Sequence, residues 1–446
     1  MNEMKKLLSI TLLLSMCACS TTQSSEVEEN VEEEQETQAL DVSTLGTGDQ
    51  YSNNEDGGHA ILADGSEDSY DNISVEKTGE SSGDEADFYG ENAAVFATNA
   101  ATLTITNSKV NTNGSHANGI FSYGEGTTVN VSNSYITTAS NNSGGIMTTG
   151  GGTMNVSNCI IETQGGSSAA IRSDRGGGTV IVDGGSYSSY GKGSPAIYST
   201  ANITVSNATL YSDISQAVVV EGCNSVTLNN VEATGKNTSK NSDNSDYYQA
   251  VMLYQSMSGD ASEGKSTFTM TDGSLTSENE GMFFVTNTVA EINLENVTLN
   301  YASDDLLRIC AAGWGNSGSN GGQVTMNNKN QSLKGNITVD SVSNLNMILD
   351  NSSFKGSIQN EGEVYVELKN GATWKLTSDS SITSLTCDAD SIDLNGYTLT
   401  VNGTEYKEGT SSTGEKIEVT VYESSHGGGD MPGGQKPDGQ PPQKPD

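Results

Sequence analysis

The stretch TLTITN (residues 102–107) is one copy of a pattern that repeats along most of this chain. Each copy starts with Thr or another polar residue, alternates apolar with polar residues, and ends in Asn or a residue that replaces it. Six successive copies end 26, 25, 26, 23 and 23 residues apart, at Asn107, Asn133, Asn158, Gly184, Asn207 and Asn230. A repeat of this length cannot bury its apolar face alone, so the copies must stack on one another.

Stacking explains which residue types recur. Val129 and Val131 alternate with Asn130, which places the two valines inside and the asparagine outside. The final Asn suits a tight turn, because Asn tolerates the left-handed backbone conformation and its amide can bond the next coil. Later copies end at 272, 296, 328, 351, 370 and 396, where Asp and Gly are the replacements. We predict an all-β fold, a single parallel β-helix of about 12 or 13 coils with an asparagine ladder. The alternative is a disordered low-complexity chain, which we do not favour because the apolar positions keep their spacing along the repeats.

Several stretches carry a family resemblance. DFYGENAAV (87–95), GGIMTTGGGT (144–153) and SSAAIRSDRGGGTV (167–180) resemble adhesin-like, carbohydrate-binding β-helix proteins of anaerobic gut bacteria. More widely, residues 45–405 resemble the right-handed parallel β-helices of the pectate-lyase-like superfamily, in which an asparagine ladder lines one turn. The resemblance implies right-handed coils. It also implies that the strand opening each coil belongs to the sheet that forms the substrate cleft in the lyases.

The N-terminus is typical of a lipoprotein signal peptide, which we assign to residues 1–19. Lys5 and Lys6 precede an apolar run at 7–16, and Cys19 follows Ala18 as lipidation requires. Cys17 follows the larger Met16, so we favour Cys19 as the lipidated residue. A plain secretory signal stays a weaker alternative, and the run is shorter than the roughly 20 residues of a membrane-spanning helix. We expect a lipid anchor on the extracytoplasmic face of the cell membrane.

The remaining divisions follow composition. Residues 20–44 form an acidic tether that we expect to be disordered. The β-helix covers 45–405, and a terminal strand or cap covers 406–423. Residues 424–446 form a Gly- and Pro-rich disordered tail. By the repeat count the four later cysteines lie about three coils apart, too far for disulfides, so we expect Cys159, Cys223, Cys310 and Cys387 to be unpaired and mostly buried.

Charge limits the partners and cofactors. The net charge of −37 argues against nucleic acid, whose phosphates are bound by Lys and Arg, and against membrane contact other than through the lipid. We expect no cofactor, although calcium is compatible with two groups of acidic side chains. Solvated loop acids are the favoured interpretation of both groups, which are Asp64, Glu67, Asp68 and Asp71 in the first turn region and Asp243 and Asp246 in a long insert.

Catalytic signals are weak. A hydrolase of this fold needs carboxylates on both sides of the glycosidic bond, and the chain lacks the Asn-Thr-Asp, Gly-His-Gly and Arg-Ile-Lys motifs of the polygalacturonase pattern. The best candidate cluster is Arg172, Asp174 and Arg175. We favour an exposed ion pair at a strand end as the interpretation of this cluster.

A binding signal lies on the strand that opens each coil. If Ile120, Ile146, Ile171 and Ile197 point inward, the residues that follow them form an apolar outward row. Apolar patches of this kind mark binding surfaces, and aromatic rings stack on sugars. The candidate ligand-binding residues are Phe121, Tyr123, Tyr198, Tyr254 and Phe283. The alternative is that inserts at 234–250 and 312–322 fold over the row and bury it.

We therefore expect a non-catalytic surface adhesin that binds polysaccharide or a host or cell-surface glycan. A polysaccharide lyase or glycoside hydrolase with a divergent site is the first alternative. A structural, self-associating surface rod is the second.

Overall fold

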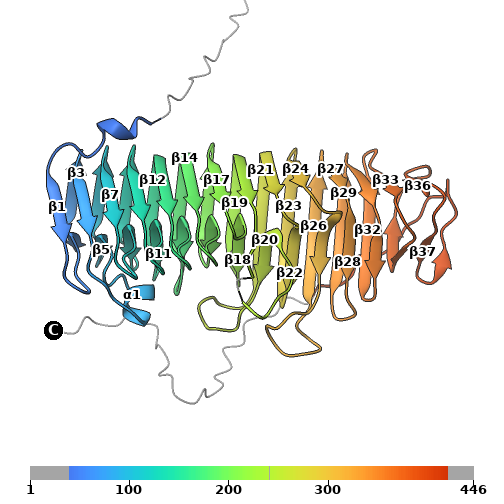
Figure 1. The fold of residues 1–446 in the computed structure, drawn as a ribbon. Coiled ribbons are helices and arrows are strands. Elements are labelled where there is room, and N and C mark those ends of the chain that lie inside the picture. The colour runs from blue at the N-terminus through green and yellow to red at the C-terminus, as the bar shows by residue number, and fades with distance from the viewer. Residues whose placement is uncertain (1–39, 241, 420–446) are drawn as a thin grey trace, which may run out of the picture. The chain divides into compact units, whose positions relative to one another are not determined.

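The computed structural model describes residues 40–240 and 242–419, and these form a parallel β-helix (Figure 1). Successive coils contribute equivalent strands to two long sheets, of 19 and 12 strands, and smaller sheets of four and three strands lie toward the C-terminal end. The prediction of an all-β fold built from stacked coils is confirmed. The 12 rungs of the shorter long sheet also agree with the predicted number of coils.

The 12-stranded sheet contains the strand that opens each coil, and all of its pairings are parallel. Its register aligns Ile120, Ile146, Ile171 and Ile197 in one inward column, as predicted. Its strands are β2 (Ile61–Asp64), β5 (Val95–Thr98), β8 (Ile120–Tyr123), β11 (Ile146–Thr149), β13 (Ile171–Ser173), β15 (Ile197–Ser199), β18 (Val218–Glu221), β20 (Gln249–Tyr254), β22 (Gly281–Thr286), β25 (Asp305–Ile309), β28 (Asn336–Val339) and β31 (Ile358–Asn360).

The 19-stranded sheet contains the repeated TLTITN-type segments and the strands that follow their Asn turns. Burial alternates along these strands, so Val129 and Val131 lie in the core while Asn130 faces outward. Its strands are β1 (Gln50–Asn53), β3 (Glu67–Asp71), β4 (Ser74–Lys77), β6 (Thr102–Thr106), β7 (Lys109–Thr112), β9 (Thr128–Ser132), β10 (Tyr135–Thr138), β12 (Gly152–Thr163), β14 (Gly178–Ser189), β16 (Asn202–Ser206), β17 (Thr209–Ser212), β19 (Ser225–Gly235), β21 (Lys265–Ser277), β23 (Thr288–Glu295), β24 (Thr298–Tyr301), β26 (Gly322–Lys329), β29 (Asn344–Asp350), β32 (Glu363–Lys369) and β35 (Ser384–Thr386).

The Asn turns have the predicted left-handed backbone. Asn133 and Asn158 have φ of 47° and 48°, and the Asn158 Nδ2 donates to Asn133 Oδ1 at 2.9 Å in a side-chain ladder. One assigned turn position is wrong. Asn330, not Asn328, has the positive φ in its coil, and Asn328 is buried with its amide on backbone carbonyls. The turn of the last coil uses Asn395 as well as Gly396.

The two ends of the stack are closed differently. At the N-terminal end the short 3-10 turn η1 (Val42–Thr44) is ordered, although it lies in the segment predicted as a tether. At the C-terminal end the segment 412–417 lies against the outer side of the 19-stranded sheet, where the Ile417 amide donates to Asn346 Oδ1 at 2.9 Å. The remaining strands there are β27 (Ser332–Lys334), β30 (Ser353–Gly356), β33 (Thr373–Leu376), β36 (Ile392–Asp393), β34 (Ser380–Ile382), β37 (Leu399–Val401) and β38 (Thr404–Glu405).

The four cysteines within the described residues are free thiols. Cys159, Cys310 and Cys387 are buried, whereas Cys223 is exposed. The lipidation candidate Cys19, the signal peptide and the tail at 424–446 lie outside the described residues.

Candidate functional site

The outward face of the 12-stranded sheet carries the predicted row of apolar side chains. Strand register differs from the prediction toward the C-terminal end of that row. Val251 pairs with Phe283 and Met252 with Phe284, so Phe283 points inward, where its ring lies 6.0 Å from that of Phe268. The predicted placement of Phe283 on the outer face is therefore wrong, because Phe284 holds the outward position. The observed row is Phe96, Phe121, Met147, Arg172, Tyr198, Val219, Met252, Phe284 and Arg308.

A short helical segment covers the N-terminal part of this row. Helix α1 (Asp84–Phe88) follows β4 and lies beside β5 to β11 (Figure 1). Phe121 and Met147 are fully buried in a cluster with Phe96, and Tyr123 packs against its edge. The Thr149 hydroxyl donates to the Phe88 carbonyl at 2.7 Å, which attaches the segment to the sheet. Phe121 is consequently not exposed, contrary to the prediction for the row.

Two inserts cover the C-terminal part of the row. Residues 236–240, 242–248 and 311–320 lie on the same side of the stack as α1, near β18 to β22 (Figure 1). The Tyr247 ring lies 5.2 Å from that of Phe284, and the Trp314 ring lies 5.1 Å from that of Tyr254. The Arg308 guanidinium stacks 4.3 Å above the Tyr247 ring. This part of the structure matches the alternative that the inserts fold over the row.

Between the two covers lies a charged cluster around Asp174. Asp174 is only 3% exposed and accepts a hydrogen bond from Arg172 Nη2 at 3.0 Å. Burial raises the pKa of Asp174 to about 6, although Arg172 lowers it, and the nearby Asp260 and Glu221 carboxylates raise it further. The predicted ion pair therefore exists, but its prediction as an exposed pair is wrong.

Arg175 joins three segments that are far apart in sequence. Its Nη1 donates to Asp84 of α1 at 2.9 Å, and its Nε donates to Asp260 at 2.7 Å. Its guanidinium also lies 3.8 Å from the centroid of the Phe88 ring. We call this set of contacts the Arg175 clasp. The Arg175 side chain remains 35% exposed, and these contacts attach the N-terminal cover to the coil that contains Arg175.

Glu221 lies two rungs from Asp174, roughly 10 Å along the stack at the normal strand spacing. It is 1% exposed, and its carboxylate accepts hydrogen bonds from the Tyr198 hydroxyl and from the backbone and hydroxyl of Ser256. Burial raises the pKa of Tyr198 and Tyr254 well above the usual range. The carboxylates of Asp174 and Glu221 thus both accept hydrogen bonds from the protein. This arrangement fits a role in positioning neighbouring side chains better than a role in proton transfer to a ligand.

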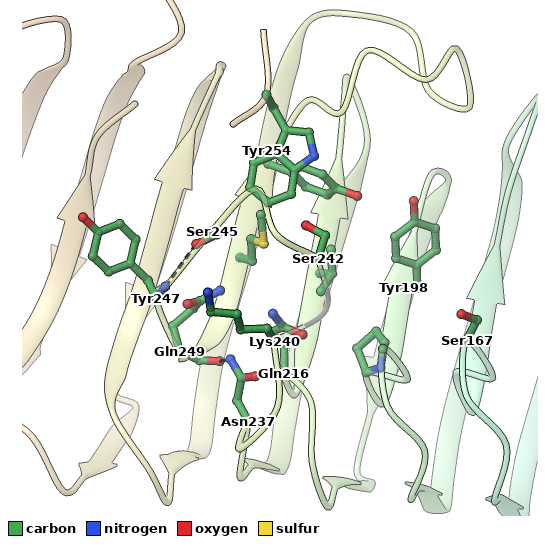
Figure 2. Close-up of a pocket in the computed structure, with 15 residues that line it drawn as sticks. Ser167, Tyr198, Gln216, Asn237, Lys240, Ser242, Ser245, Tyr247, Gln249 and Tyr254 are labelled. Carbon is green, nitrogen blue, oxygen red and sulfur yellow. Dashed lines mark hydrogen bonds between the residues drawn. The ribbon is translucent and has the colours of Figure 1, made fainter. Parts of the chain in front are cut away.

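A cavity of about 260 Å³ opens next to this cluster (Figure 2). Aromatic rings of Tyr198, Tyr254 and Trp314 line it together with the amides of Gln216 and Gln249. Among the described residues of its lining, Lys240 is the one that carries a charge. Figure 2 shows Lys240 lying across the middle of the cavity between Tyr198 and Tyr247. Lys240 is paired with Asp246 of the same insert. Rings, amides and hydroxyls around one hollow match the apolar faces and hydroxyl edges of sugars.

Two polar groups fix the floor of this cavity. Asn237 Nδ2 donates to the Gln249 carbonyl at 2.9 Å, and both side chains are buried. Gln249 Oε1 is buried and accepts no hydrogen bond from the described residues. A buried acceptor without a donor is costly, and a ligand hydroxyl or a small movement of the insert would satisfy it.

The predicted ligand residues therefore separate into groups. Tyr198 and Tyr254 come together at the cavity, Phe121 and Tyr123 lie under or beside the N-terminal cover, and Phe283 lies in the core. Reasoning from the repeat missed Trp314, Lys240 and Gln249, which belong to or follow inserts. The signal that could have found them is the lengthening of two coils, at 236–248 and 311–320, beyond the regular repeat.

The acidic residues considered for calcium do not form a site among the residues with assigned positions. In 40–240 and 242–419 no group of three or more His, Cys, Asp or Glu side chains is arranged to hold a metal ion. Asp71 instead accepts hydrogen bonds from Thr106 and Asn107, and Asp64 accepts one from Asn99. Asp246 pairs with Lys240. Asp64, Glu67, Asp68 and Asp71 lie on the first rung or beside it, where charge discourages pairing with another sheet edge.

Comparison with known proteins identified no similar protein. No protein-family model matches the chain, and no curated protein or solved structure matches it either. Among the helices of the described part, none is long and apolar enough to cross a membrane. The site must therefore be interpreted from its own geometry.

Proposed function

We propose that this protein is a non-catalytic binding protein for polysaccharide, and that the cavity beside Tyr198 holds the sugar. The observation that carries the proposal is the set of aromatic rings, Tyr198, Tyr254 and Trp314, around a hollow lined by amides. The two inserts that cover the C-terminal part of the outward face supply part of this lining, including Lys240, Tyr247 and Trp314. Its volume of about 260 Å³ is close to the lower end of the roughly 300–1,000 Å³ typical of small-ligand sites.

Rigidity of the lining supports binding as the function. The Tyr198 hydroxyl is held by Glu221, and Tyr254 is held against Trp314. Side chains that are already fixed lose little conformational freedom when a ligand arrives, which favours affinity. The proposed placement is an extracytoplasmic membrane surface, reached through lipidation of Cys19, where glycans are the abundant ligands.

The test is retention of the full chain on immobilised neutral polysaccharides, namely starch, xylan, galactomannan and mixed-linkage β-glucan. Tyr198→Ala should abolish the retention that the wild-type chain shows, because it removes a ring from the cavity. Tyr198→Phe keeps the ring and should keep most of the retention. Tyr397→Ala is the matched control, since Tyr397 is 41% exposed far along the chain near the C-terminal cap. Retention that is unchanged in Tyr198→Ala would overturn the proposal.

A glycan-cleaving activity is the second candidate, and one observation favours it. Asp174 has a pKa of about 6 and shares the outward face with Glu221, and paired carboxylates of this kind cleave glycosidic bonds. The carboxylate oxygens of both residues already accept hydrogen bonds from the protein, which argues against a glycan-cleaving role. Release of reducing ends or unsaturated products from the same polysaccharides, lost in Asp174→Asn, would establish this candidate in place of the first.

A further inference from the structure

A second cavity, of about 340 Å³, lies at the corner where β20 and β22 leave the 12-stranded sheet. Its walls are the loop 255–264 and the insert 313–321. The first cavity is bounded by Tyr254 and Trp314, and the second by the next residues along the chain, Gln255 and Gly315. Consecutive residues on these two segments therefore line the two cavities.

The rim of the second cavity carries a strained and exposed apolar residue. Met257 has φ of 67° and is 44% exposed. The left-handed conformation costs an ordinary side chain about 1–2 kcal/mol, and a turn at this place would accept Gly at no such cost. Exposed apolar surface adds nothing to folding. Backbone strain of this kind is concentrated at ligand sites. The strain at Met257 therefore indicates that this residue contacts a ligand.

The loop that presents Met257 is held in place at several points. Ser256 is bonded to Glu221, Asp260 is bonded to Arg175, and Gln255 Nε2 donates to the Ala261 carbonyl at 3.1 Å. Gln255 is itself 4% exposed, and its Oε1 accepts no hydrogen bond from residues whose positions are described. The strained conformation is therefore imposed by its surroundings, as in a site prepared before its ligand binds.

The lining of the second cavity defines the class of ligand. It is rich in amide and hydroxyl groups, which include Asn287, Asn316 and Ser319, and Glu263 is its one charged side chain. A carboxylate in the lining disfavours sugars that carry acidic groups. A methionine platform beside hydrogen-bonding amides suits the apolar face and hydroxyl edge of a neutral sugar.

We propose that this second cavity is a further subsite for the same polysaccharide chain, and that it binds neutral sugar residues beyond those held at Tyr198. The inference rests on the proposed function of the first cavity. A chain long enough to pass the 311–321 insert contacts both cavities, whereas a short saccharide fills only the first. Affinity should therefore increase with the length of the saccharide more steeply than one site alone would allow.

The experiment compares a disaccharide and a hexasaccharide of whichever tested polysaccharide retains the wild-type chain, by isothermal titration calorimetry. Met257→Gly removes the platform and relieves the strained backbone, so its melting temperature should not fall. Asn316→Ala removes an exposed amide from the opposite wall. Both variants should bind the disaccharide normally and lose about tenfold in hexasaccharide affinity, the effect of one lost contact of moderate strength. Ile181→Ala is the control, because Ile181 is 47% exposed on the 19-stranded sheet.

The outcomes separate the two proposals. Hexasaccharide binding that is unchanged in both Met257→Gly and Asn316→Ala overturns the second subsite and leaves the first cavity standing. If Tyr198→Ala binds both saccharides as tightly as the wild type, the proposed function fails and the subsite fails with it. A tenfold loss in Met257→Gly with an unchanged or higher melting temperature supports the subsite, since a purely structural role could not give that combination.

Discussion

The two long sheets bury their residues in different ways. On the 19-stranded sheet buried and partly exposed residues alternate, as in β9, whereas on the 12-stranded sheet every residue of β11 and of β22 is buried. The outer face of β9 is open, whereas the outer faces of β11 and β22 are covered by α1 and by the inserts. Alternation in a sequence shows which residues face the core. It does not show whether the other face meets water.

The largest expected difference between the sheets is the loss in free energy of unfolding when an outward side chain is truncated on each. Phe284→Ala on β22 should lower the free energy of unfolding by about 3–5 kcal/mol, because Phe284 is fully buried under Tyr247 and its loss leaves a cavity. Ile181→Ala on β14 should change it by no more than about 0.5 kcal/mol, because Ile181 is 47% exposed. Urea denaturation followed by circular dichroism measures both. Equal losses would mean that the inserts do not cover the row.

A second comparison uses pH and a carboxylate from each sheet. Asp174 has a pKa of about 6 in the folded chain against an ordinary value of 3.8, so the native state holds a proton that the unfolded chain has released. The stabilisation is complete below about pH 4 and is lost as the pH rises through 6, by about 3 kcal/mol in all. Asp174→Asn should remove this dependence, as measured by thermal melting from pH 4 to 8.

Asp213, next to the end of β17, supplies the control of opposite sign. Hydrogen bonds from Tyr211 and Lys236 lower the pKa of Asp213. Its carboxylate therefore stabilises the folded chain above the ordinary pKa of Asp, and this stabilisation is lost as the pH falls through the lowered pKa. Asp213→Asn should leave the profile between pH 4 and 8 unchanged. The same slope in wild type and Asp174→Asn would show that Asp174 is not the group that titrates.

The smallest effect concerns two positions of the 19-stranded sheet alone. Asn158→Leu should cost about 1–2 kcal/mol, because leucine is poorly tolerated at φ of 48° and the amide bond to Asn133 is lost. Asn130→Leu, on the outer face of β9, also loses a hydrogen bond, from Asn155 Nδ2 at 2.9 Å, but its backbone is extended, so the cost should be smaller, at about 0.5 kcal/mol. Melting temperatures compare the two variants. A larger loss for Asn130 would contradict the assignment of the turn column.

Much of the fold could be predicted because each coil repeats one local rule. The inward column through Ile120 and the turn at Asn158 follow from spacing and residue type alone. The register was lost where the repeat changes length, which is why Phe283 was assigned to the wrong face. Val251 still pairs with Val218 after the first insert, so the register is kept there. It changes in the next coil, which contains the loop 255–264 and places Phe283, not Met282, opposite Val251.

The site was less predictable because its parts come from segments outside the repeat. Tyr198 and Tyr254 occupy regular positions of the repeat, and both line the cavity. Trp314 and Lys240 lie in inserts whose path depends on contacts such as that between Trp314 and Tyr254. The burial of Phe121 depends on α1, which is attached through Thr149 and Arg175. Contacts between residues 61 to 91 positions apart leave no trace in local periodicity.

The Arg175 clasp also affects how the molecule opens. In a stack of coils each coil touches only its neighbours, so unfolding can start at an end and proceed one coil at a time, like a one-dimensional chain of coupled units. Arg175 connects Asp84 and Asp260, which belong to coils on either side of its own. Because these contacts break when any one of the joined coils opens, they favour opening of those coils together. In hydrogen exchange the amides from α1 to the loop at 256–263 should therefore behave as a single cooperative unit, with coils beyond the clasp fraying independently.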